Sequence, residues 1–258
     1  MRLLLSEWLR TKRTAVRWLT FFMPAIVSLC VVGYLAIRSG STQSFAFEGF
    51  FTVWSGIILP VSVGVLAGFI VHEEELAGNF TGFLGSGIPR IKLYFGKYLL
   101  LTFCMTMCTL VSALVLGVGM NVFVPVGADM KIFMSAALLT AVGTLPILAL
   151  HLWVGFAWGM GASIGISFGG LLMAVIFGTT SLGENIWQFV PWTWPIKLGL
   201  LPGTTFVEAT ANMTTANIMA SATHTGIIGL FAAAIGLVAI LLGGTIWFNK
   251  WEGRKDFE

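Results

Sequence analysis

The stretch from His72 to Lys97 reads HEEELAGNFTGFLGSGIPRIKLYFGK, and it is the densest cluster of charge in an otherwise apolar chain. Three acids follow the histidine, and acidic side chains in a first turn stabilise the positive end of a helix. Apolar side chains then recur at helical spacing, which places them on one face of a short helix. The sequence GSGIP ends that helix, because glycine permits a turn and proline cannot continue it. The acids are Glu73, Glu74 and Glu75, and the apolar face is Leu76, Phe80, Phe83 and Leu84.

Basic residues follow the predicted helix at Arg90, Lys92 and Lys97, just before a second long apolar run. A short amphipathic helix held between two apolar runs is suited to lie at a membrane interface, with its polar side open to water. We therefore predict that residues 72–90 form an interfacial helix that a partner contacts from the aqueous side.

The composition indicates an integral membrane protein. Of the 258 residues, 57% are hydrophobic and 10% are charged, and the mean hydropathy is +0.92. Soluble domains carry about 25% charged residues. The formal net charge of +3 is too mild to indicate nucleic-acid binding, so membrane lipids are the expected surroundings. All three cysteines (Cys30, Cys104 and Cys108) lie in apolar runs, so we expect no disulfide framework.

Six apolar runs of about 20 residues predict six transmembrane helices in one all-α transmembrane domain, residues 1–258. An even number of spans places both termini on the same side. That side carries eleven lysines and arginines and the other side three, so the positive-inside rule places both termini in the cytoplasm. The predicted spans are residues 18–37, 51–71, 93–118, 132–156, 160–180 and 226–248.

The connections around the fifth predicted span differ greatly in length. Residues 155–159 alone join spans four and five, which predicts a tight hairpin. Residues 181–225 separate spans five and six on the outer face, and they hold Trp187, Trp192 and Trp194 beside prolines. Tryptophan rings prefer the membrane interface, so this segment is either a re-entrant pair of half-helices or an aromatic-rich loop. The three tryptophans are candidate cargo-binding or outer-gate residues.

The N-terminal segment, residues 1–17, combines leucines and Trp8 with five basic residues. This pattern predicts an amphipathic helix lying on the cytoplasmic membrane surface. A basic flank before the first span is the alternative, and both place the segment in the cytoplasm. A secretory signal is not favoured, because the apolar run starts late, is too long and lacks a small-residue cleavage site.

Small residues recur at a regular spacing inside the fifth predicted span. Gly161, Gly165 and Gly169 follow one another every four residues, and Gly64 and Gly68 share that spacing in the second span. Such spacing lets two helices approach closely. We expect these glycines to mark helix-packing faces.

No catalytic, metal-binding or nucleotide-binding motif is complete in the sequence. The zinc motif HExxH fails at Leu76, and the nucleophile elbow around Ser86 fails at Leu84. Gly96-Lys97 is followed by Tyr98 and has no glycine five positions before it, so there is no phosphate-binding P-loop. The sequence therefore predicts a transport subunit that is not an enzyme and binds no cofactor itself. Its energy source would be another polypeptide on the inner face.

Residues 74–97 resemble a segment of the permease subunits of type-2 ABC exporters. The similarity lies in EELAGNF at 74–80, then Leu84, Pro89-Arg90 and Gly96-Lys97, which in that family lead through the coupling helix into span three. The N-terminal sequence SEWLRTKRT at 6–14 is similar to the opening of the lantibiotic-immunity (MutE/EpiE-like) branch.

The resemblance implies a bacterial cytoplasmic-membrane complex of two permease chains, identical or related, with a separate cytoplasmic ABC ATP-binding subunit. ATP and Mg would bind to that subunit, and the cargo would be an amphiphilic cationic antimicrobial peptide expelled from the producer's membrane. The residues expected to contact the ATP-binding subunit are Glu73, Glu74, Glu75, Leu76, Gly78, Phe80, Phe83, Leu84 and Arg90.

Two other classes of protein fit the sequence less well. A protein that sequesters an antimicrobial through its outer tryptophan-rich segment would need no ATP-binding partner. An enzyme embedded in the membrane would need a polar cluster at one depth, and the spans offer scattered Ser and Thr with His151.

Overall fold

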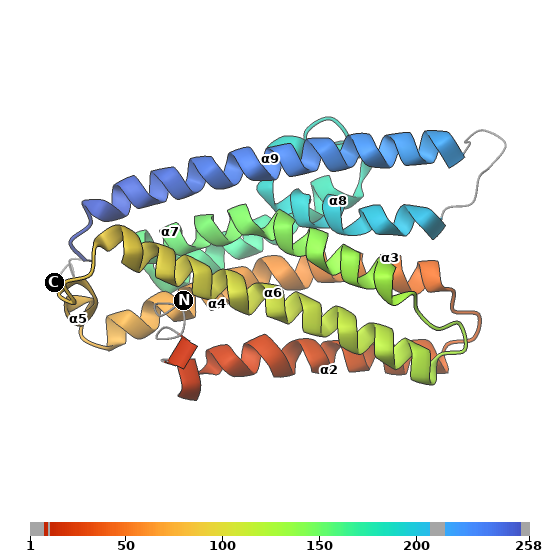
Figure 1. Cartoon of the computed structure of the whole chain (residues 1–258), viewed down its shortest axis with the longest axis horizontal. Helices are drawn as coiled ribbons and strands as arrows, with labels where there is room; N and C mark the ends of the chain where they lie inside the picture. The colour runs from red at the N-terminus through yellow and green to blue at the C-terminus, as the bar shows by residue number, and fades with distance from the viewer. Residues whose placement is uncertain (1–7, 10, 207–214, 254–258) are drawn as a thin grey trace.

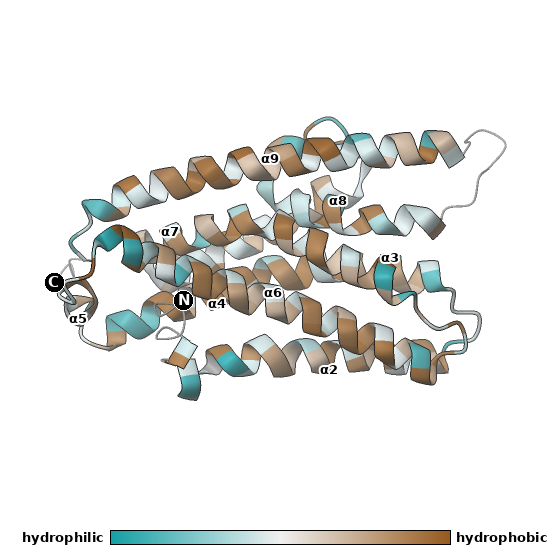
Figure 2. Cartoon of the chain, viewed as in Figure 1, coloured by the Kyte–Doolittle hydropathy of each residue, from teal (hydrophilic) through white to brown (hydrophobic). Residues whose placement is uncertain are grey.

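The computed structural model describes residues 8–9, 11–206 and 215–253. Within these residues every regular element is a helix, which confirms the predicted all-α class. Hydrophilic residues gather towards the helix ends and apolar residues run along the helices (Figure 2). Five helical segments are long and apolar enough to cross a membrane (Figure 1): Val16–Ile37, Gln43–Leu76, Arg90–Phe123, Met130–Thr179 and Thr215–Asn249.

Helix α2 (Ala15–Ile37) lies alongside α6 (Arg90–Phe123) at one edge of the bundle (Figure 1). The buried Ser28 hydroxyl donates to the carbonyl of Ser112 at 2.9 Å, which satisfies a polar group away from water. Gly119 allows Val32 to approach the α6 backbone, since a Cβ there would lie 2.6 Å from a Val32 methyl group. Helix α2 touches α4 much less, so its main support is α6.

The second long segment runs through α3 (Gln43–Val53), a π-helical turn η2 (Trp54–Ile58) and α4 (Leu59–Leu76). It therefore starts before and ends after the predicted span of residues 51–71. The π turn ends two residues before Pro60, which lacks the N–H that a regular turn would use. Wide turns of this kind are rare and often mark functional positions.

Helix α7 (Met130–Thr179) is two antiparallel helices joined at Gly159. The backbone there has φ 90° and ψ −179°, a conformation that favours glycine. A hydrogen bond of 3.1 Å joins His151 Nδ1 to Ser163 Oγ. Twelve residues of continuous helix would separate these two side chains by about 18 Å along the axis. The chain therefore reverses at Gly159, within the hairpin predicted at residues 155–159.

The predicted packing face on the second half of α7 is wrong for contacts within the chain. Gly161, Gly165 and Gly169 have no heavy atom within 4 Å of where a Cβ would stand. The hairpin instead packs on α4 through Gly64, where a Cβ would lie 2.6 Å from Ser167 Oγ and 2.8 Å from the Ser163 carbonyl oxygen. The spacing alone could not distinguish the packed glycines from the open ones.

This contrast gives a test with a matched pair of variants. We expect Gly64→Ala to lower the free energy of unfolding by about 1–3 kcal/mol, because the new methyl group meets backbone that cannot move aside. Gly165→Ala should leave the stability of the single chain unchanged or raise it by up to about 1 kcal/mol, because alanine favours the helix. The stability of both variants is measured as the fraction of protein that stays monodisperse after heating in detergent at increasing temperatures. Equal stability of the two variants would contradict this packing.

The segment that follows α7 folds back beside it as a series of short helices. These are η3 (Ser181–Gly183), η4 (Trp187–Phe189), η5 (Pro191–Thr193), α8 (Trp194–Leu200) and η6 (Leu201–Phe206). A Cβ on Gly170 would clash with the Trp192 indole. Gly170 lies nine residues before the end of α7, or about 13 Å down the helix. The segment therefore reaches well into the bundle between α7 and α9 (Figure 1).

Helix α9 (Thr215–Asn249) runs along the edge of the bundle opposite α2 and exposes most of its surface (Figure 1). Three glycines, seven and eight residues apart, let side chains of neighbouring helices approach the α9 backbone closely. A Cβ on Gly229 would lie 2.9 Å from a Leu198 methyl group, and a Cβ on Gly236 would lie 2.6 Å from the Trp194 ring. Gly244 faces the hydroxyl of Tyr94 in the same way. The helix is thus fixed at three points along its length.

Part of the predicted N-terminal amphipathic segment, residues 1–7 and 10, lies outside the described residues, as does 207–214 of the outer segment. The described part contains a short turn, η1 (Thr11–Arg13), before α2. Trp8 packs edge-on against Phe103 of α6, and the Arg17 guanidinium lies 4.5 Å above the Trp8 ring. This corner therefore ties the start of α2 to α6.

Candidate functional site

The predicted single helix at residues 72–90 is wrong in its local structure. The three glutamates end α4 instead of opening a new helix. Gly78, Asn79 and Phe80 then have positive φ angles of 125°, 47° and 64°, and α5 (Thr81–Leu84) is a single turn. The apolar run of α4 carries its helix through the acids, and the backbone at Gly78 favours a residue without a Cβ.

The predicted apolar face is consequently divided. Phe80 and Phe83 are 1% and 5% exposed, whereas Leu76 is 74% exposed. Leu84 is partly buried. The two phenylalanines are therefore internal anchors of the loop. The surface that remains open to a partner is made of Leu76, Ala77, Gly78, Asn79, Thr81, Gly82 and residues 85–89.

The anchors belong to an aromatic cluster made of Phe80, Phe83, Tyr94, Phe156, Phe248 and Trp251. Its rings come from the loop that joins α4 to α6 (residues 77–89, the α5 loop), the start of α6, the turn of α7 and the end of α9. The ring centroids of Phe80 and Trp251 are 4.9 Å apart, as are those of Phe156 and Phe248. The cluster therefore joins four parts of the bundle at its α5 end.

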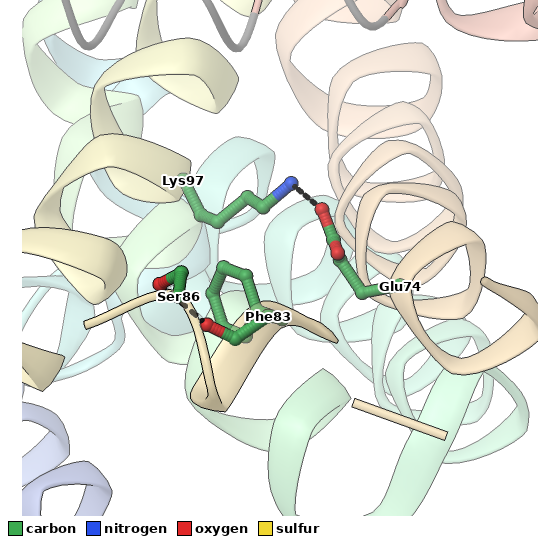
Figure 3. A network of polar contacts seen from close by, with 4 residues as sticks. All are labelled: Glu74, Phe83, Ser86 and Lys97. Atoms are coloured by element: carbon green, nitrogen blue, oxygen red, sulfur yellow. Dashed lines mark hydrogen bonds and ion pairs between the residues drawn. The ribbon is translucent and has the colours of Figure 1, made fainter. Parts of the chain in front are cut away.

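A buried ion pair lies beside the cluster. Lys97 Nζ of α6 donates to Glu74 Oε1 of α4, and the two side chains are 5% and 10% exposed (Figure 3). The ammonium also lies 5.5 Å from the centre of the Phe83 ring, and the Phe83 carbonyl accepts from Ser86 Oγ at 2.9 Å. Because buried charges are costly unless they are paired, this contact holds α4, α5 and α6 in one arrangement.

The other predicted docking residues are spread around this loop. Glu75 lies 2.9 Å from His72 on the half-exposed last turn of α4, and Glu73 is also partly buried. Arg90 does not face outward: its guanidinium donates to the carbonyls of Trp251 and, at 3.2 Å, Asn249. It therefore fastens the end of α9 to the start of α6.

Sequence reasoning missed most of the cluster. Tyr94, Phe156, Phe248 and Trp251 are separated from α5 by up to 170 residues, and none has a local pattern that distinguishes it from a lipid-facing aromatic residue. Lys97 stood out in the sequence as a basic flank and as part of the family resemblance, and neither indicated its pairing with Glu74. The available signal was that aromatic residues fall at the ends of several predicted spans on the same side.

The three candidate tryptophans of the predicted outer segment pack within the chain, and Trp192 is only partly buried, so their role as cargo-binding or outer-gate residues stays a prediction. Trp187 and Trp194 are 7% and 4% exposed. Trp194 Nε1 donates to the Gln188 carbonyl at 3.1 Å, and Trp192 is seated between Gly170 and His151, 6.3 Å from the imidazole centre. These rings hold the short helices between α7 and α9.

Two adjoining cavities lie between α2 and the segment α3–η2–α4. Their volumes are about 200 and 230 Å³, and they share Val27, Trp54 and Ile58. Together they extend along α2 from Leu19 to Leu35, or about 24 Å. Their lining is almost entirely apolar, so this α2 groove can hold hydrocarbon but offers little to a polar molecule.

Among the described residues, no group of three or more His, Cys, Asp or Glu side chains could hold a metal ion. The buried His151 instead bonds to Ser163, whose hydroxyl donates to the Gly64 carbonyl at 2.9 Å. This arrangement ties the α7 hairpin to α4.

Comparison with known protein families agrees with this architecture. The model described as ABC-2 family transporter protein matches residues 3–168, which is well over half of the chain and ends within the second half of α7. The chain therefore belongs to the ABC-2 family of transporter membrane proteins. It is a multi-pass permease of an ABC transporter, and permeases of this family generally work with an ATP-binding subunit. A search of curated proteins returned no match.

Proposed function

We propose that this chain is the permease subunit of an ATP-driven exporter in the bacterial cytoplasmic membrane. Its two termini lie in the cytoplasm, and it crosses the membrane six times. The reversal at Gly159 supports this topology, because it divides α7 into helices of about 29 and 20 residues. Each is long enough to cross about 30 Å of hydrocarbon.

The α5 loop is the site where the cytoplasmic ATP-binding subunit docks. One observation carries this assignment: the loop is exposed on its outer side and anchored on its inner side. Leu76 and residues 77–79 are open to a partner, whereas Phe80 and Phe83 are buried. A force on α5 reaches α6, the turn of α7 and the end of α9 through the aromatic cluster. ATP and Mg belong to the partner, and closure of two such subunits would move the permease helices.

The complex contains a second permease chain, identical or related. The exposed face of Gly161, Gly165 and Gly169 is a part of α7 that its own chain leaves uncovered. Small residues at this spacing allow another helix to approach closely. This face is therefore available to the second chain.

The cargo is an amphiphile drawn from the membrane, and a cationic antimicrobial peptide of the lantibiotic class is our preferred candidate. The α2 groove supports an apolar cargo portion, because it lies between two predicted spans and is lined by hydrocarbon. Sequestration by the outer tryptophans is disfavoured, since Trp187 and Trp194 are buried.

The docking assignment is tested by purification from mild detergent through a tag on the C-terminal tail. Wild type should bring down an ATP-binding subunit. Leu76→Asp should reduce its recovery at least tenfold while the permease keeps its stability, because Leu76 is 74% exposed. Lys250→Gln, exposed at the end of α9, is the control and should keep the partner. Recovery of the chain alone from an intact wild-type complex, or full recovery with Leu76→Asp, would refute the assignment.

A further inference from the structure

A third cavity lies between α8, η6 and the first turns of α9. The first turns of α9 are at the end of the bundle opposite α5 (Figure 1). The volume of the cavity is about 290 Å³. Polar and apolar residues both line it: Lys197, Ser221 and Thr225 are polar, and Leu201 and Ile218 are apolar. Ser221 and Thr225 are one helical turn apart on α9, so their side chains share a face.

Lys197 is the unusual member of this lining. Its side chain is partly buried, and no carboxylate in the described part of the chain lies within ion-pair distance of its ammonium group. Burial lowers the pKa of Lys197, and the more distant Glu184 only partly opposes that effect. A desolvated cation is costly unless an anion pairs with it.

A purely structural role accounts for part of this placement. Lys197 lies in the last turn of α8, where a cation complements the negative end of the helix. A cation in open water would complement the helix end equally well, so this interaction does not explain why Lys197 lines a cavity. The hydroxyls of Ser221 and Thr225 on the same cavity also do not serve α8. The end of α8 therefore does not account for the polar residues that line this cavity.

We infer that this cavity binds the phosphate head group of an anionic phospholipid from the surrounding membrane. The phosphate pairs with the Lys197 ammonium and accepts from the Ser221 and Thr225 hydroxyls. The first part of an acyl chain lies along Leu201 and Ile218. Charge complementarity selects an anionic head over a zwitterionic one, whose positive group would be repelled by the lysine. The site requires only that the chain lie in a membrane, so it is independent of the proposed export activity.

Native mass spectrometry of the purified protein tests this site by titration with phosphatidylglycerol, phosphatidylcholine or inorganic phosphate. Wild type should bind phosphatidylglycerol about tenfold more tightly than phosphatidylcholine, and Lys197→Gln should lose that preference. Lys197→Arg should retain it. Lys131→Gln removes an exposed lysine outside this cavity and should behave as wild type.

A second variant separates the cavity from the charge. Ala222→Phe fills the cavity from α9 without altering Lys197, and it should also weaken phosphatidylglycerol binding about tenfold. The inference is overturned if Lys197→Gln keeps the wild-type preference, if Lys131→Gln loses it equally, or if the two lipids bind alike. Binding of inorganic phosphate as tightly as phosphatidylglycerol would overturn the assignment to a lipid.

Discussion

Lys97→Met should lower the free energy of unfolding by about 3–5 kcal/mol, because it removes the cation that faces the buried Glu74 carboxylate. Methionine keeps most of the volume of lysine, so the loss comes from charge and not from a cavity. The loosened contact joins α4, α5 and α6, and we therefore also expect loss of ATP-dependent transport. Thermal unfolding of the detergent-purified protein measures the first effect, and export from reconstituted vesicles measures the second.

Two further variants isolate the ion pair. Adding Glu74→Gln to Lys97→Met removes the buried negative charge and should recover much of the lost stability. His72→Gln disrupts the half-exposed pair with Glu75 on the same helix end and should cost less than about 1 kcal/mol. A Lys97→Met protein as stable as wild type, or no recovery in the double variant, would show that the pair does not hold this end together.

Phe156→Ala should cost about 3–5 kcal/mol, since it empties the centre of the aromatic cluster. Phe156 is fully buried at the turn of α7, and its ring contacts all five other members. Phe156→Leu should cost less, because it leaves a smaller void. We expect the alanine variant to keep its ATP-binding partner, because the partner docks on the outer surface of the α5 loop. The same variant should transport poorly, because movement of the loop reaches the other helices through the aromatic cluster.

Trp158→Ala is the matched control for this prediction. Trp158 lies two residues away on the same turn and is 68% exposed. Its removal should change stability by less than about 0.5 kcal/mol. Comparable losses in Phe156→Ala and Trp158→Ala would indicate that the turn of α7, and not the cluster, sets the stability of this end.

The helices and their order could be predicted from the sequence because hydropathy is a local property. Long apolar runs predicted α2 and α6 to within several residues, and the short polar-free connection at 155–159 predicted the reversal at Gly159. The end of α9 was predicted equally well, but α9 begins at Thr215, within the polar segment predicted to lie outside the span of residues 226–248. Helix ends were less accurate. Helices α6 and α9 extend beyond the apolar windows, because a helix can continue through polar residues once its apolar part is packed.

The candidate site was only partly predictable, because its geometry depends on contacts between distant residues. The acids of residues 73–75 were expected to begin a helix, yet α4 has no reason to stop before Gly78. Phe80 fits a helical stripe by spacing alone, but its positive φ turns the ring inward to Trp251. Likewise, the exposed Gly165 and the packed Gly64 have the same local pattern and differ only in what the rest of the chain places beside them.

The close contacts at three glycines of α9 limit the ways in which this helix can move. Leu198 packs against Gly229, Trp194 against Gly236 and Tyr94 against Gly244. These contacts are spaced at intervals close to two helical turns. A shift of one residue along the helix axis, about 1.5 Å, would drive Leu198 and Trp194 towards neighbouring positions that carry a Cβ. These contacts therefore oppose a piston-like movement of α9 along its own axis.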